Sequence, residues 1–200
     1  MLGRRQTLFA ATAAAAALTP TANPRVRLQT AQGAISIDLY ARQAPLSCQD
    51  FLAYVNDGAY DGGRFFRVVR ADNDHGTPHI DVVQGGVRAG APIRRPIAHE
   101  TTSMTRLRHV DGTISLTRDK PGSGSGSEFF ICVGPQPALD FGGRRNPDGQ
   151  GFAAFGQVTA GMEVVRLIWG MGTRVGSDDA YTAGQMLGSP VVISRAWQVG

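Results

Sequence analysis

The sequence predicts a single, mostly β domain that closes into a barrel. Short segments rich in β-branched and aromatic residues recur along the chain, whereas only two segments carry apolar residues at helical spacing. The chain has 200 residues, of which 42% are hydrophobic, which is enough for one domain with its own core. It contains no internal repeat and no block of like charges. An open sheet of so many strands would leave unpaired edges, which a closed barrel removes.

The amino-terminal segment 1–22 has the three-part layout of an export signal, followed by a domain at 23–200. Arg4 and Arg5 precede an Ala-rich apolar run, and small residues lie around Ala22. The run is too short to span a bilayer, and the paired arginines favour the twin-arginine route. The alternative is an Ala-rich helix that belongs to the fold. We therefore expect a periplasmic or secreted protein.

The first elements of the domain are a hairpin and a helix. Apolar residues alternate with polar ones in segments 26–28 and 35–39, on either side of a turn at Gly33. Pro45 suits a first helical turn, and the apolar residues after it recur at steps of three and four until Gly58 ends the pattern. These spacings predict two strands followed by one amphipathic helix.

The rest of the chain alternates between short strands and turn-rich loops. A second helix is predicted at 161–171, where apolar residues again recur at helical spacing. A turn-rich loop occupies 70–79. The remaining predicted strands are 63–69, 80–86, 112–118, 128–134, 151–158 and 190–199.

A run of alternating glycine and serine at 122–127 has the composition of a flexible linker. The segments on either side are too short to fold alone, so the run does not separate two domains. It lacks the central serine of a nucleophile elbow, because Gly124 stands there. It also lacks the third glycine of a dinucleotide loop, because Ser127 stands there.

A metal site is not expected. His75, His79, Asp72 and Asp74 share one loop, yet the twelfth position of an EF-hand counted from Asp72 is Val83 rather than Glu. A plain turn explains the loop better. No other histidines or cysteines have metal-ligand spacing, and we expect no cofactor.

The cysteines and the remaining histidines fit structural roles. Cys48 and Cys132 lie in apolar stretches where buried free thiols are common, although export would allow a disulfide, and we favour free thiols. His99 and His109 are expected at the surface or in hydrogen bonds.

The formal net charge is +4, and loss of the leader would bring it closer to zero. Nothing resembles the basic, aromatic-rich patches of nucleic-acid binding, and no apolar run after the leader could anchor the chain in a membrane.

Six motifs follow one another in an order typical of one enzyme family. They are GRFFRVV, VVQGG, GTISLTR, SEFFICVG, LDFGG and FAAFGQV. Through them the chain resembles the cyclophilin-type peptidyl-prolyl cis-trans isomerases from about Val26 to the last strand. The resemblance implies an eight-stranded antiparallel β-barrel with a helix over each end, and catalysis of rotation about X-Pro bonds in polypeptides without a cofactor. We expect a monomer.

The resemblance also assigns site residues. It implies that Arg67 is the catalytic residue, and alternation with Phe66 and Val68 places Arg67 on the opposite face of its strand. The Gly/Ser run would correspond to a loop whose backbone borders the substrate groove. Substrate-binding positions fall on Phe65, Val82, Gln84, Thr117, Arg118, Glu128, Phe130, Leu139 and Phe152, the last of these replacing a histidine of the family.

The chain departs from the family pattern around the groove. Arg118 replaces an asparagine and Glu128 a glutamine, and two loops are longer, at 70–80 and 140–151. The other departures are Thr117 for alanine, Val82 for methionine and Ala138 for a large residue such as tryptophan, which weakens any expectation of cyclosporin binding.

Glu128 is the departure nearest the chemistry. We expect its carboxylate to pair with Arg67 and to compete with the prolyl nitrogen for the guanidinium, so that Glu128→Gln raises kcat/KM a fewfold. The opposite expectation, that Glu128 orients Arg67, predicts a loss.

Two other function classes remain as alternatives. A catalytically weak module could keep the groove and bind Pro-containing segments as a chaperone or assembly factor. A β-barrel with an unrelated ligand is more remote. The presence together of Arg67, Gln84 and Phe130 favours the enzyme.

Overall fold

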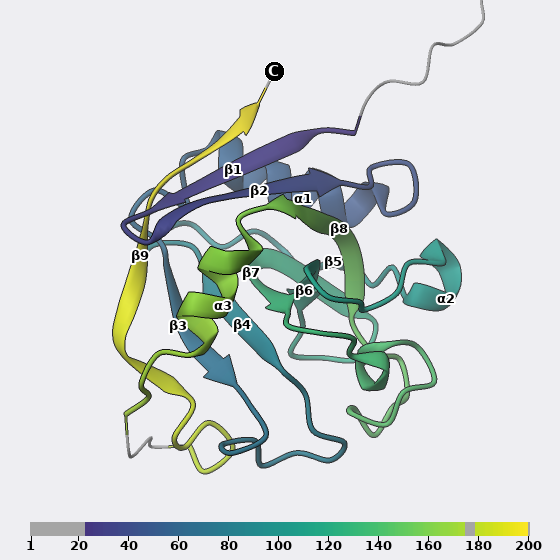
Figure 1. Ribbon diagram of the computed structural model, residues 1–200. Coiled ribbons are helices and arrows are strands. Elements are labelled where there is room, and N and C mark those ends of the chain that lie inside the picture. Colours follow the sequence, from purple (N-terminus) through teal and green to yellow (C-terminus); the bar gives the residue numbers. More distant parts are fainter. Residues whose placement is uncertain (1–22, 175–178, 200) are drawn as a thin grey trace, which may run out of the picture.

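Antiparallel strands close into a barrel in the computed structural model of this chain, which describes residues 23–174 and 179–199 (Figure 1). In those residues eight strands follow the order β4-β3-β9-β1-β2-β8-β6-β7, and β7 pairs back with β4. Their bounds are β1 Arg25–Thr30, β2 Gly33–Leu39, β3 Arg64–Val69, β4 Val82–Gly86, β6 Thr113–Thr117, β7 Ser123–Cys132, β8 Ala153–Ala160 and β9 Met186–Val199. The barrel prediction is confirmed, and the predicted leader lies outside the described residues.

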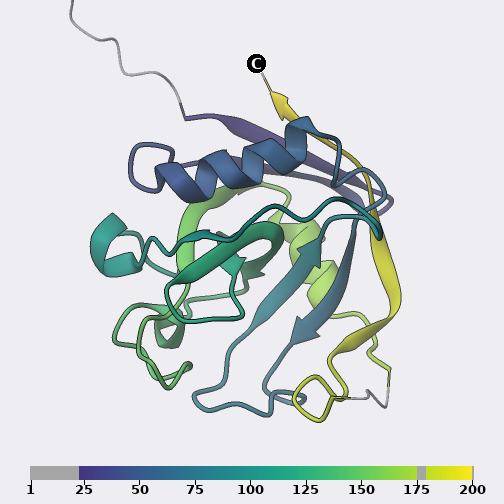
Figure 2. The same cartoon turned by 180° about the vertical axis from the view of Figure 1, so that it is seen from behind.

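Two helices lie on opposite sides of the barrel, as predicted (Figures 1 and 2). Helix α1 (Pro45–Asn56) contacts β7 and β9, whereas α3 (Met162–Trp169) contacts β2, β3 and β4. The sequence did not predict the short helix α2 (Thr102–Thr105), the 3-10 turn η1 (Pro137–Leu139) or the two-residue strand β5 (Ile97–Ala98). In the described part of the chain no helix is long and apolar enough to cross a membrane.

Aromatic rings fill the barrel beneath α1. The ring centroid of Phe51 lies 5.2 Å from that of Phe155 and 5.8 Å from that of Phe129. Tyr60 lies 5.2 Å from Phe51. Phe65 is fully buried in the same cluster, 5.7 Å from Phe129. Burial of these large apolar surfaces is a major stabilising contribution to the fold.

A β-bulge in β3 sets the direction of Arg67. The pairing of β3 with β4 shifts between Phe65 and Arg67, which makes Phe66 an extra residue on β3. Val68 is buried in the core while Arg67 is half-buried on the other face, as the alternation predicts. The same alternation is wrong for Phe66, which is only half-buried and lies beside Gly86.

The Gly/Ser run forms the first half of β7, so the prediction of a loop there is wrong. β7 begins at Ser123 and pairs there with β5. Gly126 faces α1 so closely that a Cβ atom on it would lie 2.9 Å from the Cα of Phe51. Glycine is therefore required at position 126 because a helix lies against the strand there, and the serines of the run alternate toward the outside.

The close approach of β7 to α1 predicts that Gly126→Ala lowers stability. The added methyl group would meet backbone atoms, which cannot rotate away, and overpacking of this kind costs about 1–3 kcal/mol. Gly124→Ala is the matched control, because the nearest atom to its Cβ would be Leu116 Cδ1 at 3.5 Å, an ordinary contact. Urea unfolding of both variants checks this, and equal midpoints would show that α1 can move away from β7.

Candidate active site

A hollow of about 380 Å³ lies on the outer side of β3, β4 and β7. Its volume is in the range of small-ligand sites. The predicted site residues that line it are Arg67, Val82, Gln84, Thr117, Arg118, Glu128, Phe130, Leu139 and Phe152. The structure does not place Phe65 there, because it precedes the bulge and its side chain belongs to the barrel core.

The floor of the hollow is apolar and rests on a second, smaller core. Val82, Phe130 and Leu139 are buried together there, and Phe152 packs against them. The rings of Phe130 and Phe152 meet edge to face, with centroids 5.2 Å apart. A floor built from these side chains is suited to an apolar ring of about the size of proline.

A buried polar chain supports the floor from below. His109 stacks under Phe130 at 6.0 Å, and its ring nitrogens lie 2.9 Å from Asp140 Oδ1 and 3.0 Å from Ser115 Oγ. Ser115 and His109 are 0% and 1% exposed. The three side chains have the contacts of a hydrolase triad, but a substrate has no access to the serine. They therefore fix the position of Phe130.

The guanidinium of Arg67 is held by two neutral amides. Its Nε and Nη2 donate to Oε1 of Gln185 at 2.8 and 2.5 Å, and its Nη1 donates to Oε1 of Gln84 at 2.9 Å. Arginine carries five N–H donors, so two remain for a ligand. Burial lowers the pKa of Arg67. The acceptors carry no charge, so the positive charge stays available at the hollow.

Each amide is oriented by a second acceptor. Nε2 of Gln84 donates to Oε2 of Glu128 at 2.8 Å, and Nε2 of Gln185 donates to the carbonyl of Asn73 at 2.8 Å. Both amide oxygens are thereby turned toward Arg67. The expected direct pair between Glu128 and Arg67 is not formed, because the side chain of Gln84 lies between them.

Arg118 is held by the long loop at 140–151. Its Nη1 and Nη2 donate to the two carboxylate oxygens of Asp148 at 2.8 and 2.7 Å, and its Nε donates to the carbonyl of Gly151 at 2.8 Å. The guanidinium lies over the ring of Phe152, with Cζ 5.5 Å from the centroid. Bidentate pairing gives this contact a fixed geometry, so Arg118 forms a wall of the hollow.

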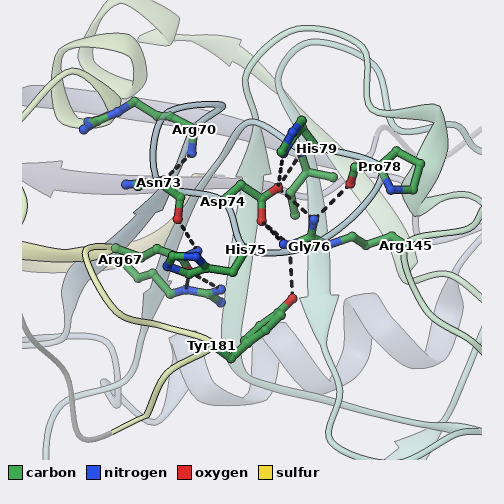
Figure 3. A network of polar contacts seen from close by, with 12 residues as sticks. Arg67, Arg70, Asn73, Asp74, His75, Gly76, Pro78, His79, Arg145 and Tyr181 are labelled. Atoms are coloured by element: carbon green, nitrogen blue, oxygen red, sulfur yellow. Dashed lines mark hydrogen bonds and ion pairs between the residues drawn. The ribbon is translucent and has the colours of Figure 1, made fainter.

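In the loop after β3, the carboxylate of Asp74 pairs with Arg145 (Figure 3). Asp74 accepts from both terminal nitrogens of Arg145 at 2.7 Å, while His75 lies 2.8 Å from the carbonyl of Ala183. Within residues 23–174 and 179–199, no three metal-ligating side chains converge. The loop is a structural support for the hollow.

A second hollow of about 370 Å³ adjoins the first along β7. The two share Thr117, Arg118, Asp119 and Glu128. Ser123, Gly124, Ser125 and Ser127 line the second hollow, so the Gly/Ser run borders the groove, as predicted. An extended peptide could occupy both hollows at once.

Comparison with known proteins decides the family. Residues 25–187 match the family model described as cyclophilin type peptidyl-prolyl cis-trans isomerase/CLD. The chain belongs to the cyclophilin family. Peptidyl-prolyl cis-trans isomerase A of Dickeya dadantii (strain 3937) is 32% identical over 193 residues, or 95% of this chain and 92% of that relative. A peptidyl-prolyl cis-trans isomerase of Streptomyces antibioticus is 34% identical over 178 residues, or 88% of this chain and 98% of the relative.

Solved structures agree with this assignment. A crystal structure of a cyclophilin type peptidyl-prolyl cis-trans isomerase from Cryptosporidium parvum has a TM-score of 0.65 at 20% identity, and the match covers 89% of this chain and 98% of that one. The fold is that of the cyclophilins. The family match and the named relatives show that this cyclophilin is a peptidyl-prolyl cis-trans isomerase.

Several residues of the site carry no signal in the sequence. Gln185 holds Arg67 from 118 positions away, and Tyr181 lines the hollow from the same segment. Both lie beyond the last motif before β9. The other lining residues that the sequence did not predict are Ile80, Asp119, Arg145 and Asn146. Proximity in space alone brings them to the site.

The cysteines and His109 behave as predicted, whereas His99 does not. Cys48 and Cys132 are free and buried, and burial raises the pKa of Cys48 to about 12. His109 is hydrogen-bonded. His99 is buried, and among the described residues neither of its ring nitrogens has a hydrogen-bond partner. Burial lowers the pKa of His99, and the charge of Arg118 lowers it further.

The environment of Glu128 predicts a pH-dependent gain in stability for Glu128→Gln. Burial raises the pKa of Glu128, although the hydrogen bond from Gln84 opposes this. A carboxyl group whose pKa is higher in the folded state than in the unfolded chain destabilises the fold once both states are ionised. The variant should therefore be more stable than wild type at pH 7. The difference should shrink as the pH falls below the raised pKa of folded Glu128, and it should be nearly gone by about pH 4, where unfolded glutamate is also protonated.

Unfolding of the two proteins in urea between pH 3.5 and 7 measures this difference. Glu163→Gln is the control, since Glu163 is an exposed carboxylate in the first turn of α3 and its removal should bring no gain. A Glu128→Gln variant less stable than wild type at pH 7 would mean that the charged hydrogen bond with Gln84 outweighs the burial of the carboxylate.

Proposed function

We propose that this cyclophilin accelerates rotation about X-Pro bonds in polypeptide substrates, with Arg67 stabilising the twisted bond. The observation that carries the proposal is the state of Arg67: a charged group beside an apolar floor, with two N–H donors left over and only neutral acceptors. The same side chains would let a Pro-containing peptide bind without any covalent step.

The required chemistry is modest. Amide resonance sets a barrier of about 18–20 kcal/mol, and the uncatalysed rotation takes tens to hundreds of seconds. Millisecond turnover requires an acceleration of about 10⁴–10⁵-fold, or about 5–7 kcal/mol. Rotation breaks no covalent bond, so the chain needs to supply only differential binding of the twisted state.

The hollow offers two such interactions. The floor around Phe130 would hold the proline ring equally in all states and so fix the substrate. As the bond twists, the prolyl nitrogen becomes pyramidal and its lone pair, which is delocalised into the carbonyl in the planar amide, becomes localised on the nitrogen. A guanidinium N–H can then donate to it. A donor that gains its acceptor only in the twisted state lowers the barrier.

We further propose that the substrates are exported or envelope polypeptides and that the protein acts as a monomer without nucleic acid or membrane partners. The leader pattern at 1–22 and the nearly balanced charge of the rest support this. A closed barrel also leaves little free strand edge through which copies could pair.

The role of Arg67 predicts a large loss of activity on Arg67→Ala. Removing the donor should lower kcat/KM by roughly 10²–10³-fold, about 3–4 kcal/mol, with the fold intact. A protease-coupled assay on a peptide of the Ala-Ala-Pro-Phe type measures it. Arg42→Ala, at an exposed arginine outside both hollows, is the control. Activity of Arg67→Ala within twofold of wild type would remove Arg67 from the mechanism, and an inactive wild type that still binds the peptide would favour a binding module.

The proposed export route has its own test. The twin-arginine translocon reads the arginine pair and not only its charge, so Arg4→Lys with Arg5→Lys should leave a precursor in the cytoplasm. Cell fractionation followed by immunoblotting distinguishes precursor from mature chain. Normal export of the double variant would indicate the general secretory route, and the isomerase assignment would be unaffected.

A further inference from the structure

Tyr181 lies between the guanidinium groups of two arginines at the edge of the hollow. Cζ of Arg67 lies 5.5 Å from the centroid of its ring and Cζ of Arg145 lies 5.9 Å from it. The side chain comes from the segment between residue 179 and β9, and it lines the hollow that Arg67 faces. The residue is 49% exposed, so burial of the ring is not what keeps it there.

A buried ion pair anchors the tyrosine. Its hydroxyl accepts a hydrogen bond from Nη2 of Arg145 at 3.0 Å, and the same guanidinium pairs with both oxygens of Asp74 at 2.7 Å (Figure 3). The side chains of Arg145 and Asp74 are 2% and 0% exposed. Backbone N–H groups of Gly76 and Ile80 complete the shell of Asp74, each at 2.9 Å. The anchor therefore has little freedom to move.

We propose that Tyr181 is a positioning residue for Arg67, its ring held in place by the Arg145–Asp74 pair. The negative face of an aromatic ring attracts a guanidinium without occupying an N–H donor. A carboxylate at this place would neutralise Arg67 and compete with the substrate for the same donors. The ring instead restricts the guanidinium while leaving its charge and two donors available.

This role rests on the proposed function of Arg67, and it explains a contrast within the hollow. Arg118 and Arg145 each have a bidentate carboxylate partner, whereas Arg67 donates to the neutral amides of Gln84 and Gln185. The two amides accept hydrogen bonds from the edges of the guanidinium group, in its plane. The ring of Tyr181 supplies attraction without charge, and so favours the orientation that the twisted substrate requires.

The test compares Tyr181→Leu with Tyr181→Phe in the peptide isomerase assay. Removing the ring should lower kcat/KM by about three- to tenfold, as expected for loss of a partly desolvated cation–π contact. Tyr181→Phe loses the hydrogen bond from Arg145 but keeps the contact of the ring with the guanidinium groups of Arg67 and Arg145, so it should stay within twofold of wild type. Trp197→Leu is the matched control, because Trp197 also lies between two arginines, Arg27 and Arg195, but away from the hollow.

A background without Arg67 shows whether the effect acts through that residue. In Arg67→Ala, assayed at higher enzyme concentration, adding Tyr181→Leu should cause no further loss. A further three- to tenfold loss of kcat/KM in that background would overturn the proposal. It would also be overturned if Tyr181→Leu alone kept a kcat/KM within twofold of wild type, or if Tyr181→Phe were as impaired as Tyr181→Leu. These outcomes differ from failure of the proposed function itself, in which Arg67→Ala would retain activity.

Discussion

The pairing of β4 with β7 is the constraint on which the site depends. It closes the barrel and sets Gln84 opposite Phe130, while β3 sets Arg67 opposite Gln84 on the other side. Neighbours along each strand face the core, as Val83 and Phe129 do, so these three residues must face outward. A slip of one residue in the register would exchange the core and the site. The same hydrophobic pattern that stabilises the barrel therefore assembles the groove.

Arg67 is placed where a structural arginine would be unfavourable. Burial disfavours a charge and lowers the pKa of Arg67. An adjacent carboxylate would offset that penalty, and Arg145 obtains such an offset from Asp74. Arg67 has neutral partners, the amide oxygens of Gln84 and Gln185 and the side chain of Tyr181, which support its geometry without neutralising it. Keeping Arg67 charged in a partly buried pocket lowers the stability of the fold. The same charge is needed to stabilise the lone pair that becomes localised on the prolyl nitrogen.

The sequence predicts most of the fold and of the hollow because both depend on local pattern. Alternating residues and family motifs place the barrel, its two main helices and the lining positions from Val82 to Phe152. The bulge at Phe66 and the strand at the Gly/Ser run were mispredicted, since each depends on what packs against the segment. The separation of Glu128 from Arg67 by Gln84, and the contacts of Gln185 and Tyr181, depend on side chains brought together from distant segments. No spacing in one sequence encodes these contacts.

The two long loops supply partners to polar side chains around the groove. Arg118 replaces the asparagine of the family, and the loop at 140–151 supplies both its carboxylate partner, Asp148, and its carbonyl acceptor at Gly151. The loop at 70–80 supplies Asp74 to Arg145 and Asn73 to Gln185. Each loop thus supplies a carboxylate that neutralises one arginine of the hollow: Asp148 pairs with Arg118, and Asp74 pairs with Arg145. Among the three arginines lining the hollow in the described chain, this leaves Arg67 as the one whose hydrogen-bonded partners are neutral, so the loops confine the usable positive charge to one point of the groove.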